Sequence, residues 1–119
     1  TVYFFSFKSN VFKYLYRCSC FILTSLWEDP GFVIAEAISV NKPVISSNCP
    51  NGPEEFLSNG KGGFLFKSNN LKDLVKVFVE FEKSNKDTIK KKIITSKKVI
   101  KNYTSFRHYL ELKKNILYE

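Results

Sequence analysis

The chain has 119 residues, a formal net charge of +8 and 44% hydrophobic residues, enough for a folded domain. It contains no run of 18 or more apolar residues, so no membrane-spanning helix is expected. The three cysteines are odd in number and do not have a metal spacing, which favours buried free thiols over a zinc or redox site. We therefore expect free thiols in a reducing cytoplasm.

The pattern of apolar and turn residues predicts strands alternating with helices. The predicted elements, in chain order, are a strand at 2–5, a helix at 10–17, a buried strand at 20–24, a helix that begins at residue 30 and is apolar over 32–40, a strand at 43–46, a helical turn at 53–57, a strand at 64–66 and a helix from 71 to about 82 that Asn70 caps. Alternation with short loops indicates an α/β fold, a parallel sheet with helices on both faces. Ligands of such sheets bind beyond the carboxyl ends of the strands, where residues 25–31 and 47–53 fall.

Two glutamates, Glu28 and Glu36, are separated by seven residues, one just before the predicted helix and one inside its apolar stretch at 32–40. That helix is apolar on nearly every side, so we expect it to be buried. Asp29 is its predicted cap and Pro30 its first residue. Because an unpaired buried carboxylate is costly, Glu36 needs a partner, either a protein donor or a ligand hydroxyl.

The geometry of a strand that leads into a helix favours a ligand. The free N–H groups of Gly31, Phe32 and Val33, together with the helix dipole, form a site for an anion. Gly31 lets a phosphate approach the backbone. Glu36 lies about 9 Å further along the helix axis, and Glu28 lies on the other side of that phosphate. An anion site between two hydroxyl acceptors suits a sugar nucleotide.

Three blocks of sequence, in this order, resemble a known family. They are Glu-x7-Glu after a strand (28–36), Asn-Lys-Pro-Val-Ile-Ser-Ser-Asn-Cys-Pro-Asn-Gly-Pro-Glu-Glu-Phe-Leu (41–57) and Asn-Gly-Lys-Gly-Gly-Phe-Leu-Phe (59–66). Together they resemble the donor-binding half of retaining GT-B glycosyltransferases. More narrowly, they resemble the large bacterial group called glycosyl transferases group 1, which builds lipopolysaccharide, capsule and related glycans. The resemblance runs from about residue 7 to residue 74.

The resemblance implies a role for each matched residue. Glu36 matches the family's second glutamate, which accepts hydrogen bonds from the ribose hydroxyls of the nucleotide. Glu28 matches the first glutamate, which contacts hydroxyls of the donor sugar, and it is the residue predicted to be catalytic. Two further groups of residues are implied to bind the donor. Gly31, Phe32 and Val33 match the segment that meets the sugar and diphosphate. Asn51 and Gly52 match the loop that faces the donor.

The resemblance also implies an enzyme larger than this chain. GT-B enzymes have two Rossmann-like domains with the active site between them, and residues 1–82 correspond to part of the C-terminal, donor-binding domain. The missing N-terminal domain is the expected partner, and the fragment alone is expected to be inactive. The implied reaction transfers a sugar with retention from a nucleotide sugar, a UDP-sugar by default, to a glycan or lipid-linked acceptor. No metal and no cofactor are expected.

Positive charge is concentrated in residues 83–119. Residues 1–82 hold eight basic and eight acidic residues, whereas residues 83–119 hold eleven basic and three acidic residues. Apolar residues at helical spacing predict one or two amphipathic helices that pack on the same domain, with Thr104 and Ser105 as a break and cap. These apolar positions are Ile89, Ile93, Ile94, Val99, Ile100, Tyr103, Phe106, Tyr109 and Leu110.

The lysines of this segment allow two interpretations, a solvated helix face or attraction to anionic lipid headgroups. Nucleic acid is not expected as a partner, because the aromatic residues fall on the apolar face. The expected location is the cytoplasm, and contact with the inner face of the cell membrane fits a lipid-linked acceptor. The alternative to an enzyme is a non-catalytic binding module. In it both glutamates are structural caps and the basic tail docks to membrane or nucleic acid.

Overall fold

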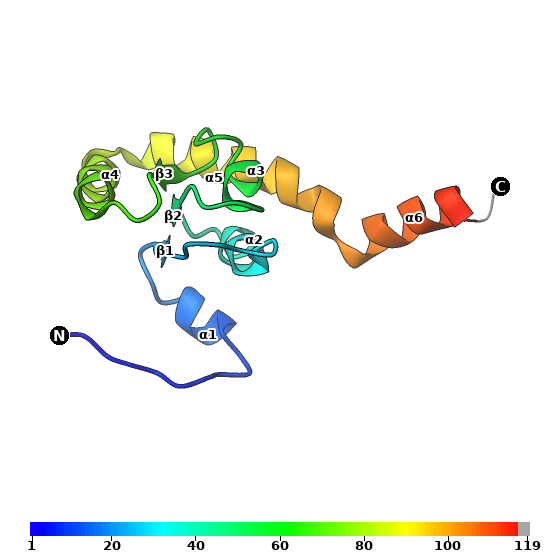
Figure 1. Cartoon of the computed structure of the whole chain (residues 1–119), viewed down its shortest axis with the longest axis horizontal. Coiled ribbons are helices and arrows are strands. Elements are labelled where there is room, and N and C mark those ends of the chain that lie inside the picture. The colour runs from blue at the N-terminus through cyan, green and yellow to red at the C-terminus, as the bar shows by residue number, and fades with distance from the viewer. Residues whose placement is uncertain (117–119) are drawn as a thin grey trace.

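Three short parallel strands form the centre of the fold in the computed structural model (Figure 1). They are β1 (Phe21–Leu23), β2 (Val44–Ser47) and β3 (Phe64–Phe66), and they lie in the order β1-β2-β3. Phe21 is opposite Val44 in the register, and Ile45 is opposite Phe64. The carboxyl ends of all three strands therefore lie at the same edge of the sheet.

Helices connect and follow the strands. They are α1 (Phe12–Leu15), α2 (Phe32–Ser39), α3 (Pro53–Phe56), α4 (Leu71–Lys83), α5 (Lys86–Ile100) and α6 (Ser105–Ile116), with the 3-10 turn η1 (Lys101–Tyr103) before α6. The structure describes residues 1–116. Residues 117–119 and the side chains of the predicted tail positions Phe106 and Tyr109 lie outside the described residues. Among residues 1–116, no helix has both the length and the apolar character needed to cross a membrane.

Strand β2 separates two apolar cores, because its residues alternate between the faces of the sheet. On one face Val44 belongs to a cluster with Ile38 of α2 and Phe56 of α3. On the other face Ile45 belongs to a cluster with Phe81 of α4. Helices therefore cover both faces of a parallel sheet, and the predicted α/β fold is confirmed.

Helix α5 packs closely on the turn that leads into β3. The Ser96 hydroxyl donates to the carbonyl oxygen of Gly62 at 2.8 Å. The Lys92 ammonium donates to the carbonyl oxygens of Gly60 at 2.7 Å and Gly63 at 2.9 Å, and burial lowers the pKa of Lys92. A methyl group at Gly62 would lie only 1.9 Å from Ser96 Oγ, so the absence of a side chain allows this approach.

Helix α6 points away from the sheet (Figure 1). The backbone N–H of Arg107 donates to Thr104 Oγ1 at 3.2 Å, which confirms the predicted break and cap at residue 104. Helix α5 reaches both cores through Ile89 and Ile100, whereas the main contacts of α6 are with η1. The division into residues 1–82 and 83–119 stays a prediction.

Most predicted elements occur close to their expected positions. The strand predicted at 64–66 is β3, and the helix predicted from residue 71 is α4. Asn70 caps α4 as predicted, because its side chain accepts a hydrogen bond from the backbone N–H of Asp73 at 3.0 Å. The helix predicted at 10–17 is shorter, since only the four residues of α1 are helical.

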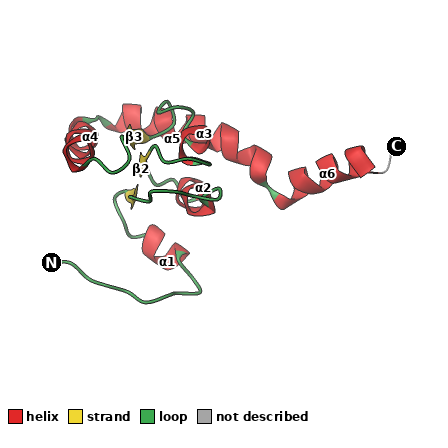
Figure 2. Cartoon of the chain, in the orientation of Figure 1, coloured by secondary structure: helices red, strands yellow, loops and turns green. Residues whose placement is uncertain are grey.

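The strand predicted at residues 2–5 is wrong. This segment has no regular structure, and Phe4 is 94% exposed. An apolar run becomes a strand only where a neighbouring strand pairs with its backbone groups, and no strand of residues 1–116 lies beside it (Figure 2). The strand predicted at 20–24 is present as β1. It is an edge strand of the described sheet rather than a buried one, and Ile22 is 41% exposed.

Candidate functional site

Two loops meet beyond the carboxyl ends of β1 and β2. The Ser47 hydroxyl, at the end of β2, donates to the carbonyl oxygen of Ser25 at 2.5 Å. The backbone N–H of Glu28 donates to the carbonyl oxygen of Pro50 at 3.4 Å. The edge of the sheet predicted to bind a ligand is thus built by two loops that contact each other.

Gly52 lets these loops approach closely. It has a φ of 135°, and a Cβ atom at this position would lie 1.8 Å from the carbonyl oxygen of Pro30. Asn51 is exposed and has a left-handed φ of 67°. Pro50 and Gly52, on either side of Asn51, therefore lie against the loop that carries Glu28.

The side chain of Glu28 lies over Gly31. A Cβ atom on Gly31 would be 3.0 Å from Glu28 Oε2, and Gly31 has a left-handed φ of 80°. Gly31 is the residue that precedes helix α2. The prediction of Asp29 as the cap and Pro30 as the first helical residue is wrong. The reason is that a right-handed helix cannot include the left-handed backbone of Gly31, so the helix begins at the next residue, Phe32.

The first backbone N–H groups of α2 are available to a ligand. The first bond of this turn joins the N–H of Ile34 to the carbonyl oxygen of Gly31 at 3.0 Å. Within residues 1–116 the N–H groups of Phe32 and Val33 have no hydrogen-bond acceptor. Phe32 is exposed, Val33 is half-buried and Gly31 is buried. Free N–H groups and the helix dipole make this terminus favourable for an anion.

Glu36 lies one turn further along α2 and is half-buried. Its backbone carbonyl accepts a hydrogen bond from the Ser39 hydroxyl at 2.7 Å. Its carboxylate has no hydrogen bond or ion pair with any group in the described part of the chain. Of the two partners expected for Glu36, a protein donor or a ligand hydroxyl, the protein donor is therefore absent from the described residues. The helix is also less buried than expected, since Phe32 and Ser39 are exposed.

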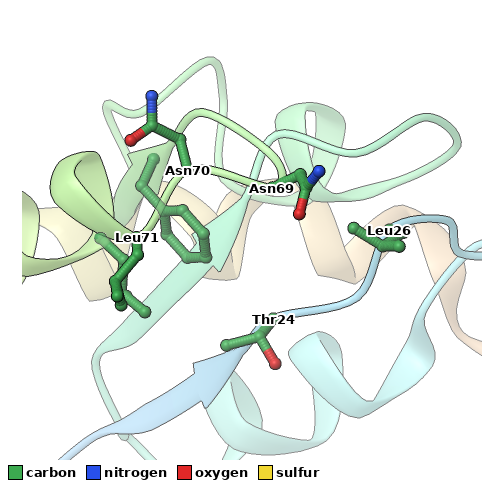
Figure 3. Close-up of a pocket in the computed structure, with 7 residues that line it drawn as sticks. Thr24, Leu26, Asn69, Asn70 and Leu71 are labelled. Carbon is green, nitrogen blue, oxygen red and sulfur yellow. The ribbon is translucent and has the colours of Figure 1, made fainter.

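A pocket of about 250 Å³ lies at the same edge of the sheet, beyond β1 and β3 (Figure 3). Its lining combines polar and apolar side chains: Thr24, Leu26, Phe66, Asn69, Asn70, Leu71 and Leu74. Thr24 and Leu26 belong to the loop that carries Glu28. The three sequence blocks do not predict Asn69 or Leu71 as pocket residues. Only their position shortly after β3, at the carboxyl edge of the sheet, could have indicated them. Such mixed linings are common in small-molecule sites.

Tyr103 joins the C-terminal segment to α3. Its hydroxyl donates a hydrogen bond to Glu55 Oε1, and its ring lies 4.9 Å from that of Phe56. The ring of Phe56 in turn lies 6.2 Å from that of Phe32, at the start of α2. The hydrogen bond to Glu55 raises the pKa of Tyr103 to about 12, and burial and the charge of Glu55 act in the same direction.

We expect Glu55→Gln to lower the pKa of Tyr103 toward its ordinary value of about 10. A pKa that is higher in the folded state means that the hydrogen bond stabilises the fold below about pH 10. This contribution is lost as the pH rises toward 12. An ultraviolet titration of the phenolates measures the shift, with Tyr103→Phe to assign the signal. Glu54→Gln is the matched control, and an unchanged titration in Glu55→Gln would contradict the contact.

The carboxyl edge of this parallel sheet carries a free helix N-terminus and two carboxylates. Ligands of α/β domains bind at this edge of the sheet. The model of the family described as Glycosyl transferases group 1 matches residues 1–104. The chain belongs to this family, which confirms the resemblance found in the sequence.

Individual relatives agree with the family. The chain is 45% identical over 56 residues to an uncharacterized glycosyltransferase from Methanocaldococcus jannaschii, a match that covers 47% of this chain and 14% of that protein. It is 30% identical over 53 residues to the poly(ribitol-phosphate) alpha-N-acetylglucosaminyltransferase from Staphylococcus aureus, covering 44% and 11%. The crystal structure of a glycosyltransferase from Rickettsia africae superimposes with a TM-score of 0.73 at 30% identity, covering 94% of this chain and 31% of that one. The chain spans less than a third of the length of each of these proteins.

Proposed function

We propose that this chain forms the donor-binding part of a glycosyltransferase that transfers a sugar from a nucleotide sugar to a glycan or lipid-linked acceptor. The observation that carries the proposal is the edge formed by Glu28, Gly31 and the start of α2, with the unpaired Glu36 one turn further on. Membership of the glycosyl transferases group 1 family supports it.

Each group at this edge has a task in the proposed reaction. The N–H groups of Phe32 and Val33 hold the diphosphate, and the helix dipole stabilises the negative charge that grows on the leaving phosphate. Glu36 accepts hydrogen bonds from the ribose hydroxyls. Glu28 accepts a hydrogen bond from the donor sugar and orients it for transfer. The backbone of Asn51 closes the site from the side of the second loop.

Three finer points belong to the proposal. The sugar is transferred with retention at the anomeric carbon, the donor is a UDP-sugar, and no metal is required because helix N–H groups offset the charge of the diphosphate. Analysis of the product's anomeric configuration tests the first point, and a product of inverted configuration would refute it. Activity lost on adding a chelator and restored by a divalent cation would refute the third.

The remaining points concern the setting of the enzyme. The reaction takes place in the cytoplasm, in the synthesis of cell-surface polysaccharide or lipopolysaccharide. A preceding acceptor-binding domain of the same polypeptide completes the active site. Transfer assays with the complete natural polypeptide and with this chain alone test the last point, and equal rates would contradict it.

The test of donor binding is calorimetric titration of UDP, GDP and ADP, with their sugar conjugates, into the complete natural polypeptide. We expect one nucleotide to bind selectively. We expect Glu36→Ala to weaken it at least about tenfold, because a hydrogen bond to a charged group contributes about 1.5–3 kcal/mol. Glu80→Ala, which removes an exposed carboxylate from α4, is the matched control and should leave the affinity unchanged.

The same titration decides between the two functions. Equal binding by the wild-type and Glu36→Ala proteins, or no binding by either, would remove Glu36 from the site. It would favour the alternative, a non-catalytic binding module in which the glutamates are structural.

A further inference from the structure

Six of the seven lysines in helix α5 and the first residue of η1 surround one exposed isoleucine, while the seventh, Lys92, binds the turn before β3. With 3.6 residues per turn, Ile94 falls at the middle of the outward arc of the helix. Lysines flank it on both sides: Lys86, Lys90, Lys97 and Lys101 on one, Lys91 and Lys98 on the other. We call these six lysines and Ile94 the lysine face. Ile94 is 47% exposed, and all of the lysines except the half-buried Lys97 are exposed. The sequence of α5 contains one acidic residue, Asp87, so this surface has a net charge of about +5.

An apolar groove of about 290 Å³ runs along one side of the lysine face. It is lined by Asn41, Lys86, Ile89, Lys90, Ile93, Ile94 and Lys97. The Lys97 ammonium donates to Asn41 Oδ1 at 2.6 Å, which fixes one end of the groove. Isoleucine side chains between ammonium groups match a partner that is both apolar and anionic.

The lysine face is separate from the edge that carries Glu28. Helix α5 contacts Asn41 through Lys97, and it contacts Gly62 through Ser96. Asn41 lies in the loop that enters β2, and Gly62 lies in the loop that enters β3. The candidate donor site instead follows the carboxyl ends of the strands. A ligand of the lysine face therefore need not compete with the sugar donor.

We propose that the lysine face docks this protein on an anionic lipid bilayer. The ammonium groups lie among the headgroup phosphates while the lysine stems and Ile94 contact the apolar boundary below them. The charge of the face and its apolar centre both match such a surface. This inference goes beyond the proposed function and does not depend on it, because attachment to a bilayer requires no donor and no transfer.

The composition of the face favours lipid over other anionic partners. Residues 86–101 contain no aromatic side chain on which a base could stack, which disfavours single-stranded nucleic acid. Every cation of the face is a lysine, whereas protein interfaces are depleted in lysine and enriched in arginine. An isoleucine surrounded by long, flexible cations instead suits the boundary between headgroups and acyl chains.

The test is flotation of the complete natural polypeptide with vesicles of phosphatidylcholine alone or mixed with phosphatidylglycerol. We expect binding only to the anionic vesicles, and weaker binding at high salt. The triple variant Lys90→Gln, Lys91→Gln, Lys98→Gln should lower the partition coefficient about a hundredfold, since each lysine near an anionic surface contributes about a factor of five. Ile94→Ser should weaken binding without any change in charge.

Matched variants separate the lysine face from general charge. Lys61→Gln, Lys72→Gln, Lys76→Gln removes the same charge from exposed positions on other elements and should leave binding within about twofold of wild type. Val75→Ser on α4 is the control for Ile94→Ser. Circular dichroism shows that the variants fold. No binding to anionic vesicles, an equal loss in both triple variants, or binding to a single-stranded oligonucleotide in place of vesicles would overturn the proposal.

Discussion

Glu28→Gln in the complete natural polypeptide is expected to reduce sugar transfer by a factor of at least about 10² to 10³ while the protein stays folded. Removing one group positioned at a reacting centre commonly has an effect of this size. The Glu28 carboxylate is held over Gly31, and within residues 1–116 it makes no hydrogen bond or ion pair that folding would lose. Glutamine keeps the shape of the side chain but not its charge. Steady-state transfer rates, measured together with thermal unfolding, give both quantities.

The control for this prediction is Asp29→Asn. Asp29 is the exposed neighbouring acid, so its replacement removes the same charge from the same loop. We expect this variant to keep most of its activity. A Glu28→Gln protein that transfers at the wild-type rate would contradict the proposed role. So would one whose lower rate is fully explained by a lower melting temperature, because a binding module with structural glutamates predicts that result.

Gly52→Ala is expected to destabilise the fold by about 2–4 kcal/mol and to weaken donor binding. The new Cβ atom would lie 1.8 Å from the carbonyl oxygen of Pro30, and the φ of 135° is itself unfavourable for alanine. The two loops must separate to admit it, which moves the backbone that carries Glu28. Denaturant unfolding measures the loss of stability, and calorimetric titration of the nucleotide measures the loss of binding.

Gly60→Ala is the matched control. Gly60 also has a left-handed φ, 86°, but the nearest atom to an added Cβ is Leu65 Cδ1 at 4.0 Å. Its replacement should cost only the backbone term of about 1 kcal/mol and should not change donor affinity. Equal losses of stability in the two variants would show that the close approach to Pro30 is not what makes Gly52 necessary.

Local patterns predicted the elements whose determinants lie within a few residues. The strand at 64–66 follows a glycine turn and is a short apolar run, and the cap at Asn70 depends on a neighbour three residues away. The break at Thr104 is similarly local. These features depend on backbone preferences and short-range hydrogen bonds, which the sequence displays directly.

The predictions that failed depended on distant partners or on a single backbone angle. Residues 2–5 have the composition of a strand, but strand formation requires a second strand beside them. Asp29 is a typical cap residue and predicts a helix start at Pro30, whereas the left-handed backbone of Gly31 decides the boundary. Apolar periodicity carries no information about either determinant.

The sequence by itself determined the α/β class, the family and the positions of Glu28 and Glu36, because apolar patterning and the three ordered blocks are linear features. Only the tertiary structure decided that the Glu28 carboxylate lies over Gly31 and that Gly52 contacts Pro30. It also placed Tyr103 on Glu55, 48 residues away. Contacts between distant segments depend on how the elements pack in three dimensions, and short-range spacing along the chain does not specify that packing.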